Sequence, residues 1–225
     1  MQIISPKDGF SFAAHHAPAQ GARKGGLVVV QEIFGVTDHI RDICNRFAAE
    51  GYESLAPSLF DRLEPGFEHN SQPNQDAVQK GLGFVSRTPW DQVGADIQAC
   101  IDKLAGPVFV TGFCWGGTAS WIAASRCRKV AGASAFYGRL IEQCLSDSPK
   151  APIILHYGKH DASIPPENVA RVHAAYPHTP IHMYDAGHSF CREGAEGFDE
   201  ASRELALRRT LEFFAAHSTG APHAA

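Results

Sequence analysis

The sequence lacks a long apolar run, a basic leader and any surplus of positive charge. A membrane-spanning helix needs about 20 consecutive, mostly apolar residues, and no segment approaches that length. The N-terminal stretch MQIISPKDGF has neither the basic start nor the apolar core of a signal peptide. Basic residues number 20 and acidic residues 24, so a nucleic acid is not an expected partner. We therefore expect a soluble, cytoplasmic protein with no membrane or nucleic-acid partner.

Cysteine pairs are also missing. The six cysteines are scattered, without a CxxC pair or the spacing of metal ligands, and no pair of histidines suggests a metal site. Neither a disulfide framework nor a metal centre is predicted, and no cofactor is expected. Most of the cysteines are expected to be small, buried apolar residues. They are Cys44, Cys100, Cys114, Cys127, Cys144 and Cys191.

No stretch resembles a linker, so we expect residues 1–217 to form one domain and residues 218–225 a disordered tail. Short apolar runs rich in β-branched residues alternate with segments of helical period. This alternation predicts an α/β fold, in which helices cover both faces of a mostly parallel sheet. The expected strands are 26–31, 52–56, 107–112, 130–137, 152–158 and 180–186, with a small antiparallel pair at the N-terminus.

Apolar residues at helical spacing predict helices around 40–48 and 93–104. Further helices are expected near 165–175, over 200–216 and directly after residue 114. Residues 57–76 are polar and without period, so they are expected to form a long loop between a strand and the next helix. Long loops of this kind in α/β folds often face the substrate.

The segment GFCWG, residues 112–116, has the pattern of a nucleophile elbow with sulfur in place of the usual hydroxyl. Cys114 follows an apolar strand and precedes a helical segment, and the flanking glycines let the chain reverse sharply. The start of a helix favours a thiolate, because its free N–H groups and its dipole stabilise negative charge. The alternative is a buried structural cysteine in a tight turn.

A nucleophilic cysteine needs a histidine base and an acid that orients it. Asp161 and His188 lie in the loops after two later strands, which gives the chain order nucleophile, acid, histidine of the α/β-hydrolases. In that arrangement His188 moves the proton and Asp161 fixes its tautomer. His160 and Asp185 are the rivals, because they lie in the same two loops.

The chemistry also needs two backbone N–H donors for the negative oxygen that forms during acyl transfer. One donor comes from the residue after the nucleophile, which is Trp115. The other comes from the loop after an early strand, where Ile33 is the candidate. The sequence therefore predicts an oxyanion hole made by the amides of Ile33 and Trp115.

Four motifs together carry a family resemblance. They are QEIFGV (31–36), GFCWGG (112–117), GKHDASIP (158–165) and DAGHSFCR (185–192). In this order and at these intervals they closely resemble the dienelactone hydrolases over about residues 5–216. The resemblance implies an α/β-hydrolase fold and the hydrolysis of a small activated lactone or ester, such as a carboxylate-bearing dienelactone, through Cys114, His188 and Asp161 and an acyl-thioester.

The resemblance also implies roles for three further residues. Glu32 would hold the thiol at rest and help to generate the thiolate when substrate arrives; alternatively it pairs with Arg192 or caps its loop. Arg192 would bind the substrate carboxylate, for which its planar fork is suited. Phe34 is also expected to be a substrate-binding residue.

A second carboxylate-binding arginine is expected in this family, and the chain has none at the matching place near residues 78–80. Lys80 and Arg62 are the candidate substitutes. This departure leaves the hydrolase chemistry intact but puts the dienelactone substrate in doubt.

Two functions of other classes are compatible with the same residues. One is a non-catalytic protein of this fold that binds a small carboxylate. The other is a redox-sensing thiol protein in which Cys191 resolves an oxidised Cys114. Apart from the small-molecule substrate, a monomer or a weak homo-oligomer is expected.

Overall fold

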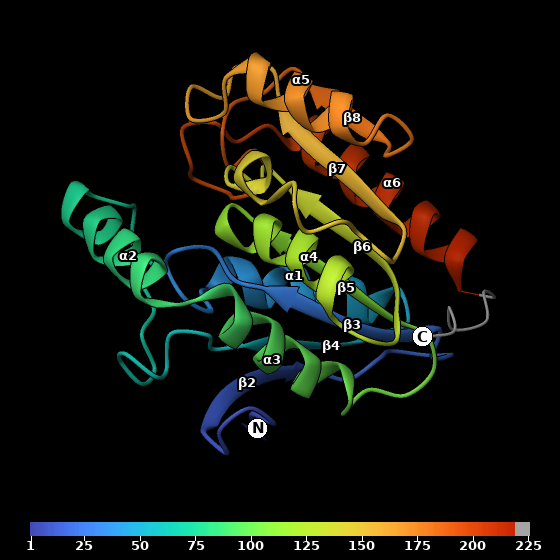
Figure 1. Ribbon diagram of the computed structural model, residues 1–225. Helices are drawn as coiled ribbons and strands as arrows, with labels where there is room; N and C mark the ends of the chain where they lie inside the picture. Colours follow the sequence, from blue (N-terminus) through green and yellow to red (C-terminus); the bar gives the residue numbers. More distant parts are fainter. Residues whose placement is uncertain (219–225) are drawn as a thin grey trace.

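The computed structural model describes residues 1–218. The expected disordered tail, apart from Ser218, lies outside the described residues. Figure 1 shows helices on both sides of a twisted central sheet. The alternation of strands and helices predicted from the sequence is therefore confirmed, and the fold is of the α/β class.

Eight strands form the sheet in the described residues, in the order β1-β2-β4-β3-β5-β6-β7-β8. The first two strands are the antiparallel pair expected at the N-terminus, and β2 also pairs antiparallel with β4. From β4 to β8 all neighbours are parallel. The strands are β1 (Gln2–Ile4), β2 (Ser11–Ala17), β3 (Gly25–Val30), β4 (Tyr52–Pro57), β5 (Val108–Phe113), β6 (Val130–Phe136), β7 (Ile153–Gly158) and β8 (Ile181–Tyr184).

Each strand expected from the sequence is present, with bounds shifted by two residues at most. The central strands β3, β5 and β7 are buried along their whole length, which explains why they appear in the sequence as continuous apolar runs. Because β4 to β8 run parallel, their carboxyl ends meet at one edge of the sheet. Ligands bind at that edge in open α/β folds.

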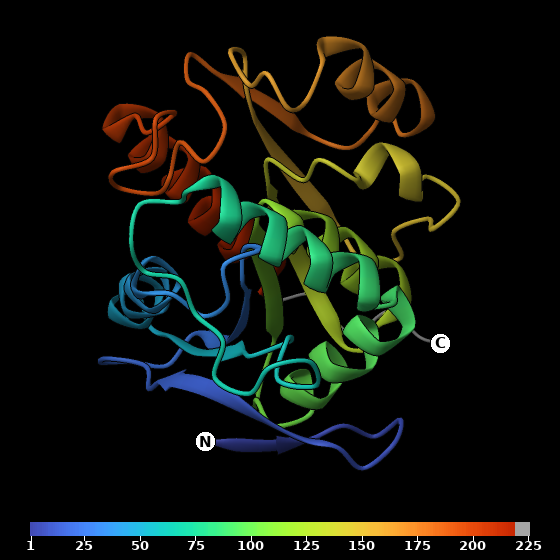
Figure 2. The same cartoon turned by 90° about the vertical axis from the view of Figure 1, so that its left-hand side faces the viewer.

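Helices α1 and α6 lie on one face of the sheet, and α3 and α4 lie on the other (Figures 1 and 2). The helix around 40–48 has a single buried stripe, as its apolar spacing predicted. The helices are α1 (Asp38–Ala49), α2 (Gln75–Arg87), α3 (Trp90–Ile101), α4 (Trp115–Arg126), α5 (Pro166–Ala175) and α6 (Glu200–His217), with a 3-10 turn η1 at Ile141–Cys144.

The sequence did not predict α2, which begins where the expected long loop ends. Its apolar stripe is weak, because it buries only Ala77, Gly81 and Phe84. Asn74 caps its first turn by accepting a hydrogen bond from the Ala77 N–H at 2.8 Å. Figure 2, which looks toward the carboxyl ends of the strands, shows α2 crossing the front of the molecule.

Candidate active site

A cavity of about 970 Å³ opens at the carboxyl ends of the strands. Cys114 and His188 line it from two separate loops, and the apolar face of α2 forms part of its wall. Ile33 and Trp115, which carry the two expected oxyanion donors, also line this cavity. So do Phe34 and Arg192, the two residues expected to contact substrate.

Cys114 stands at a strained turn between β5 and α4. Its backbone has φ 56° and ψ −116°, a conformation that costs a non-glycine residue about 1–3 kcal/mol. Gly112 and Gly116 make the turn possible, because a Cβ on Gly112 would overlap the Gly116 carbonyl and one on Gly116 would overlap the Val30 carbonyl. The half-buried sulfur is thus held at the N-terminus of α4, where the helix dipole stabilises negative charge.

Aromatic packing fixes Trp115, the residue next to the cysteine. Its ring stacks on Phe60 at 5.0 Å and on Trp90 at 5.8 Å between centroids, and only 3% of the residue is exposed. On the other side of the site, the backbone of Ile33 packs against Gly81 of α2, where a Cβ would overlap the Ile33 carbonyl. Both candidate oxyanion donors therefore belong to rigid, close-packed backbone.

Asp161 and His188 form a short hydrogen bond. The Nδ1–H of His188 donates to Asp161 Oδ2 at 2.6 Å, and the Asp161 side chain is fully buried. Ser163 completes the arrangement, because both its N–H and its hydroxyl donate to the other carboxylate oxygen of Asp161, at 2.8 and 2.6 Å. These bonds fix the carboxylate and leave the Nε2 atom of His188 for a second partner.

The charges of Asp161 and His188 stabilise each other. Burial raises the pKa of Asp161, but the hydrogen bonds from His188 and Ser163 outweigh it and hold that pKa below its ordinary value. Burial likewise lowers the pKa of His188, yet the neighbouring Cys114 sulfur and the Asp161 carboxylate raise it to about 10. The site therefore favours the protonated form of His188.

The two rival residues pair with each other instead. His160 Nε2 lies 2.7 Å from Asp185 Oδ1, and both side chains are largely exposed. Neither makes a hydrogen bond with His188 among the described residues. Their mutual contact at the rim separates them from the Asp161–His188 pair.

Arg192, which lines the cavity, and Glu32, which does not, form a buried ion pair. Arg192 Nη1 lies 3.5 Å from Glu32 Oε2, and its guanidinium lies over the Phe34 ring at 4.8 Å from the centroid. The pairing of Glu32 with Arg192, left open by the sequence, is thus present. Within residues 1–218 the other carboxylate oxygen, Glu32 Oε1, is buried without a hydrogen-bond partner.

The candidate substitutes for a second arginine are engaged elsewhere. Arg62 pairs with Asp8 and Asp96, and Lys80 pairs with Glu64. Neither Arg62 nor Lys80 lines the cavity. In this structure neither is placed to contact a ligand in the cavity, because both are paired with carboxylates outside it.

Sequence reasoning missed three residues at this site. Ser163 stands two residues after Asp161, the spacing at which an aspartate accepts from a nearby N–H in a turn, so the signal was available. Tyr137 and Arg139 follow the carboxyl end of β6, a position that favours ligand contact. The Tyr137 ring lies 5.1 Å from that of His188 between centroids, and Arg139 lines the cavity.

Among residues 1–218, no cluster of three or more histidine, cysteine or acidic side chains is placed to hold a metal ion. In the same part of the chain, no helix combines the length and apolar character needed to cross a membrane.

A mostly parallel sheet with a strained cysteine at a strand-to-helix elbow defines the α/β-hydrolase class. The sequence pattern of the dienelactone hydrolase family matches residues 12–218, so the chain belongs to this family of lactone and ester hydrolases.

Individual proteins with names of this family are similar to the chain. A "Putative carboxymethylenebutenolidase" of Salmonella typhimurium is 37% identical, with 93% of this chain and 84% of the relative covered. The carboxymethylenebutenolidase of Pseudomonas sp. strain P51 is 33% identical over 93% of this chain and 92% of its own length. The crystal structure of a "Putative Dienelactone Hydrolase" from Klebsiella pneumoniae superposes with a TM-score of 0.82 at 30% identity, covering 96% of this chain and 97% of that one.

Proposed function

We propose that the protein hydrolyses a small, activated lactone or ester through Cys114, His188 and Asp161. One observation carries the proposal: the strained cysteine and the Asp161–His188 pair, at 2.6 Å, come together at a single cavity at the strand ends. Cysteine suits an activated carbonyl, because a thiolate is a strong nucleophile near neutral pH.

The reaction begins as the Cys114 sulfur attacks the carbonyl carbon, its proton held on Nε2 of His188. The amides of Ile33 and Trp115 stabilise the negative oxygen that develops. The carbon–oxygen bond of the ester then breaks, and the leaving oxygen takes the proton from His188. Water, deprotonated by His188, attacks the acyl-thioester; the acid product leaves and the thiol proton returns to Cys114.

Glu32 and Arg192 have accessory roles in this proposal. A substrate carboxylate that binds Arg192 beside Phe34 competes with Glu32 for the guanidinium. The freed Glu32 carboxylate, of which one oxygen already lacks a partner in the described residues, is then available to help generate the thiolate. The pair thus connects binding of an anionic substrate with activation of Cys114.

The test compares wild type with Cys114→Ala on dienelactone and on a short aryl ester. We expect kcat/KM to fall by at least about a thousandfold, as is usual when a covalent nucleophile is removed. Cys127→Ala is the matched control, because Cys127 is also half-buried but lies outside the cavity. Equal rates for wild type and Cys114→Ala would refute the proposal.

The redox-sensing alternative has less support. Cys191 is buried, and burial raises the pKa of its thiol well above the ordinary value, which keeps it in the unreactive form. We expect peptide mapping after peroxide treatment to find no Cys114–Cys191 disulfide. The binding-protein alternative predicts a carboxylate ligand that binds without turnover.

A further inference from the structure

Two arginines line the cavity that holds Cys114, and they differ in their surroundings. Arg192 is 7% exposed, paired with Glu32 and packed on Phe34. Arg139 is exposed and, within residues 1–218, forms no salt bridge and no side-chain hydrogen bond. Arg139 is therefore the cavity-lining cation whose charge is not already neutralised by a carboxylate in the described part of the chain.

The backbone that carries Arg139 is tied to the elbow. The Cys114 N–H donates to the Phe136 carbonyl at 3.0 Å, and the Leu140 N–H donates to the Thr118 hydroxyl at 3.1 Å. Between these two bonds, a Cβ on Gly117 would overlap the Phe136 carbonyl, so the chain that leads to Arg139 packs directly on the start of α4. The position of residue 139 relative to the nucleophile is thus set by close-packed backbone.

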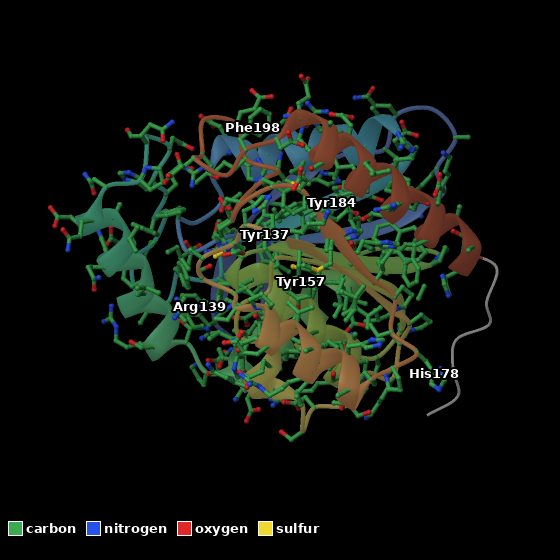
Figure 3. All side chains as sticks on the ribbon, turned by 90° about the horizontal axis from the view of Figure 1, so that it is seen from above. Tyr137, Arg139, Tyr157, His178, Tyr184 and Phe198 are labelled. Atoms are coloured by element: carbon green, nitrogen blue, oxygen red, sulfur yellow. The ribbon has the colours of Figure 1, made fainter. Side chains whose placement is uncertain are left out.

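The rest of the cavity wall is unevenly charged. Three acidic residues, Asp185, Glu196 and Asp199, lie in the segment that follows β8. The wall contributed by α2 is apolar. It consists of Val78, Leu82 and Val85. Figure 3 shows Arg139 on the side of the molecule where α2 lies. The segment after β8 also carries Arg192, whose charge Glu32 balances, so Arg139 is the stronger attraction for an anionic group in this cavity.

We propose that Arg139 is a specificity-determining residue of this cavity that binds a carboxylate on the substrate. The inference rests on the proposed function and adds to it the orientation of the substrate. The carbonyl under attack lies at Cys114, the apolar body lies along α2, and the carboxylate lies within reach of Arg139 as well as of Arg192, both of which line the cavity. A guanidinium binds a carboxylate in two-pronged geometry, which favours this class of substrate over a neutral ester.

The experiment uses two esters with the same leaving group and acyl chains of the same length. One is 4-nitrophenyl hydrogen succinate, which carries a carboxylate, and the other is the neutral 4-nitrophenyl butanoate. For Arg139→Gln we expect kcat/KM on the succinate to fall about tenfold, mainly through KM, as expected for loss of a charge-assisted hydrogen bond. The rate on the butanoate should stay within about twofold. Arg139→Glu should lower the succinate rate further and again spare the butanoate.

Arg128→Gln is the matched control, since Arg128 is also exposed and unpaired through its side chain in residues 1–218 but lies outside the cavity. It should leave both rates unchanged. An equal fall on both esters in Arg139→Gln, or no fall on either, would overturn the role of Arg139 while leaving the hydrolase itself intact. The proposed hydrolase mechanism is refuted separately if Cys114→Ala retains wild-type turnover of the butanoate.

Discussion

The floor and the cover of the cavity are built in opposite ways. The floor, residues 31–36 and 112–117, is buried except for Cys114 and is locked by glycines that touch neighbouring carbonyls. The cover, residues 58–87, is mostly exposed or half-buried and is held in part by a surface ion pair between Lys80 and Glu64. Under the proposed function, the floor fixes where the bond is broken, whereas the cover and the rim bound the space left for the substrate.

This difference predicts that substitutions in the floor, or at Asp161 and His188, slow the turnover of all substrates. Substitutions in the cover slow the turnover of some substrates and not of others. The same contrast predicts that substitutions in the floor lower the stability of the fold, whereas substitutions in the cover change which substrates are hydrolysed. A larger side chain does not fit in the floor, because protein interiors are close-packed. A cover residue borders the cavity and solvent, so its replacement costs little folding free energy.

The largest expected effect comes from Asp161→Asn. An asparagine in this fully buried position favours the wrong tautomer of His188, and loss of about a thousandfold to ten-thousandfold in kcat is expected for neutral and anionic esters alike. Steady-state kinetics on 4-nitrophenyl butanoate and on 4-nitrophenyl hydrogen succinate measure this loss in kcat. Asp185→Asn, which removes the exposed rival that pairs with His160, should leave kcat unchanged. A large loss in Asp185→Asn with little in Asp161→Asn would reverse the assignment.

How far the sequence predicts this site can be judged residue by residue. The elbow, the Asp161 loop and the His188 loop were predictable, because each is a short motif that directly follows a buried strand. Helix α2 was not, because two glycines interrupt its apolar stripe and one of them, Gly81, is explained only by its contact with the Ile33 backbone. Arg139 was missed because its proposed role depends on the absence of an acidic partner within residues 1–218, which only the structure reveals.

A pair of glycine substitutions tests the contrast in stability. Gly116→Ala in the floor places a Cβ against the Val30 and Gln31 carbonyls, so we expect a loss of at least about 3 kcal/mol in the free energy of unfolding. Gly83→Ala in α2 meets no atom within 4 Å and should stabilise the protein by about 0.5–1 kcal/mol. Chemical denaturation measures both, and similar values for the two variants would contradict the contrast.

The charge on His188 predicts a pH-dependent contribution to stability. Its pKa is raised to about 10 in the folded protein, so its contribution is complete below the ordinary histidine pKa of about 6.5. That contribution is lost as the pH rises through about 10. The free energy of unfolding of wild type relative to His188→Gln should therefore decline between pH 7 and pH 10. A difference that stays constant or grows over this range would show that His188 is neutral at pH 7.

The smallest expected effect lies in the cover. Leu82 is 39% exposed and lines the cavity, so Leu82→Ala removes apolar surface that the substrate would otherwise cover. We expect KM for 4-nitrophenyl butanoate to rise by about threefold, with kcat unchanged. Met183→Ala is the control, because Met183 is 41% exposed and does not line the cavity. A fall in kcat in Leu82→Ala would mean that the cover takes part in the chemistry.

The central claim is that the Cys114 sulfur carries the acyl group during turnover. The direct measurement is peptide mass spectrometry after 4-nitrophenyl butanoate has been mixed with the enzyme and quenched in acid within the first turnover. We predict a butanoyl group on the peptide that contains Cys114 and none on the peptide that contains Cys127. Full turnover with an unmodified Cys114 peptide, together with wild-type rates in Cys114→Ala, would contradict the account.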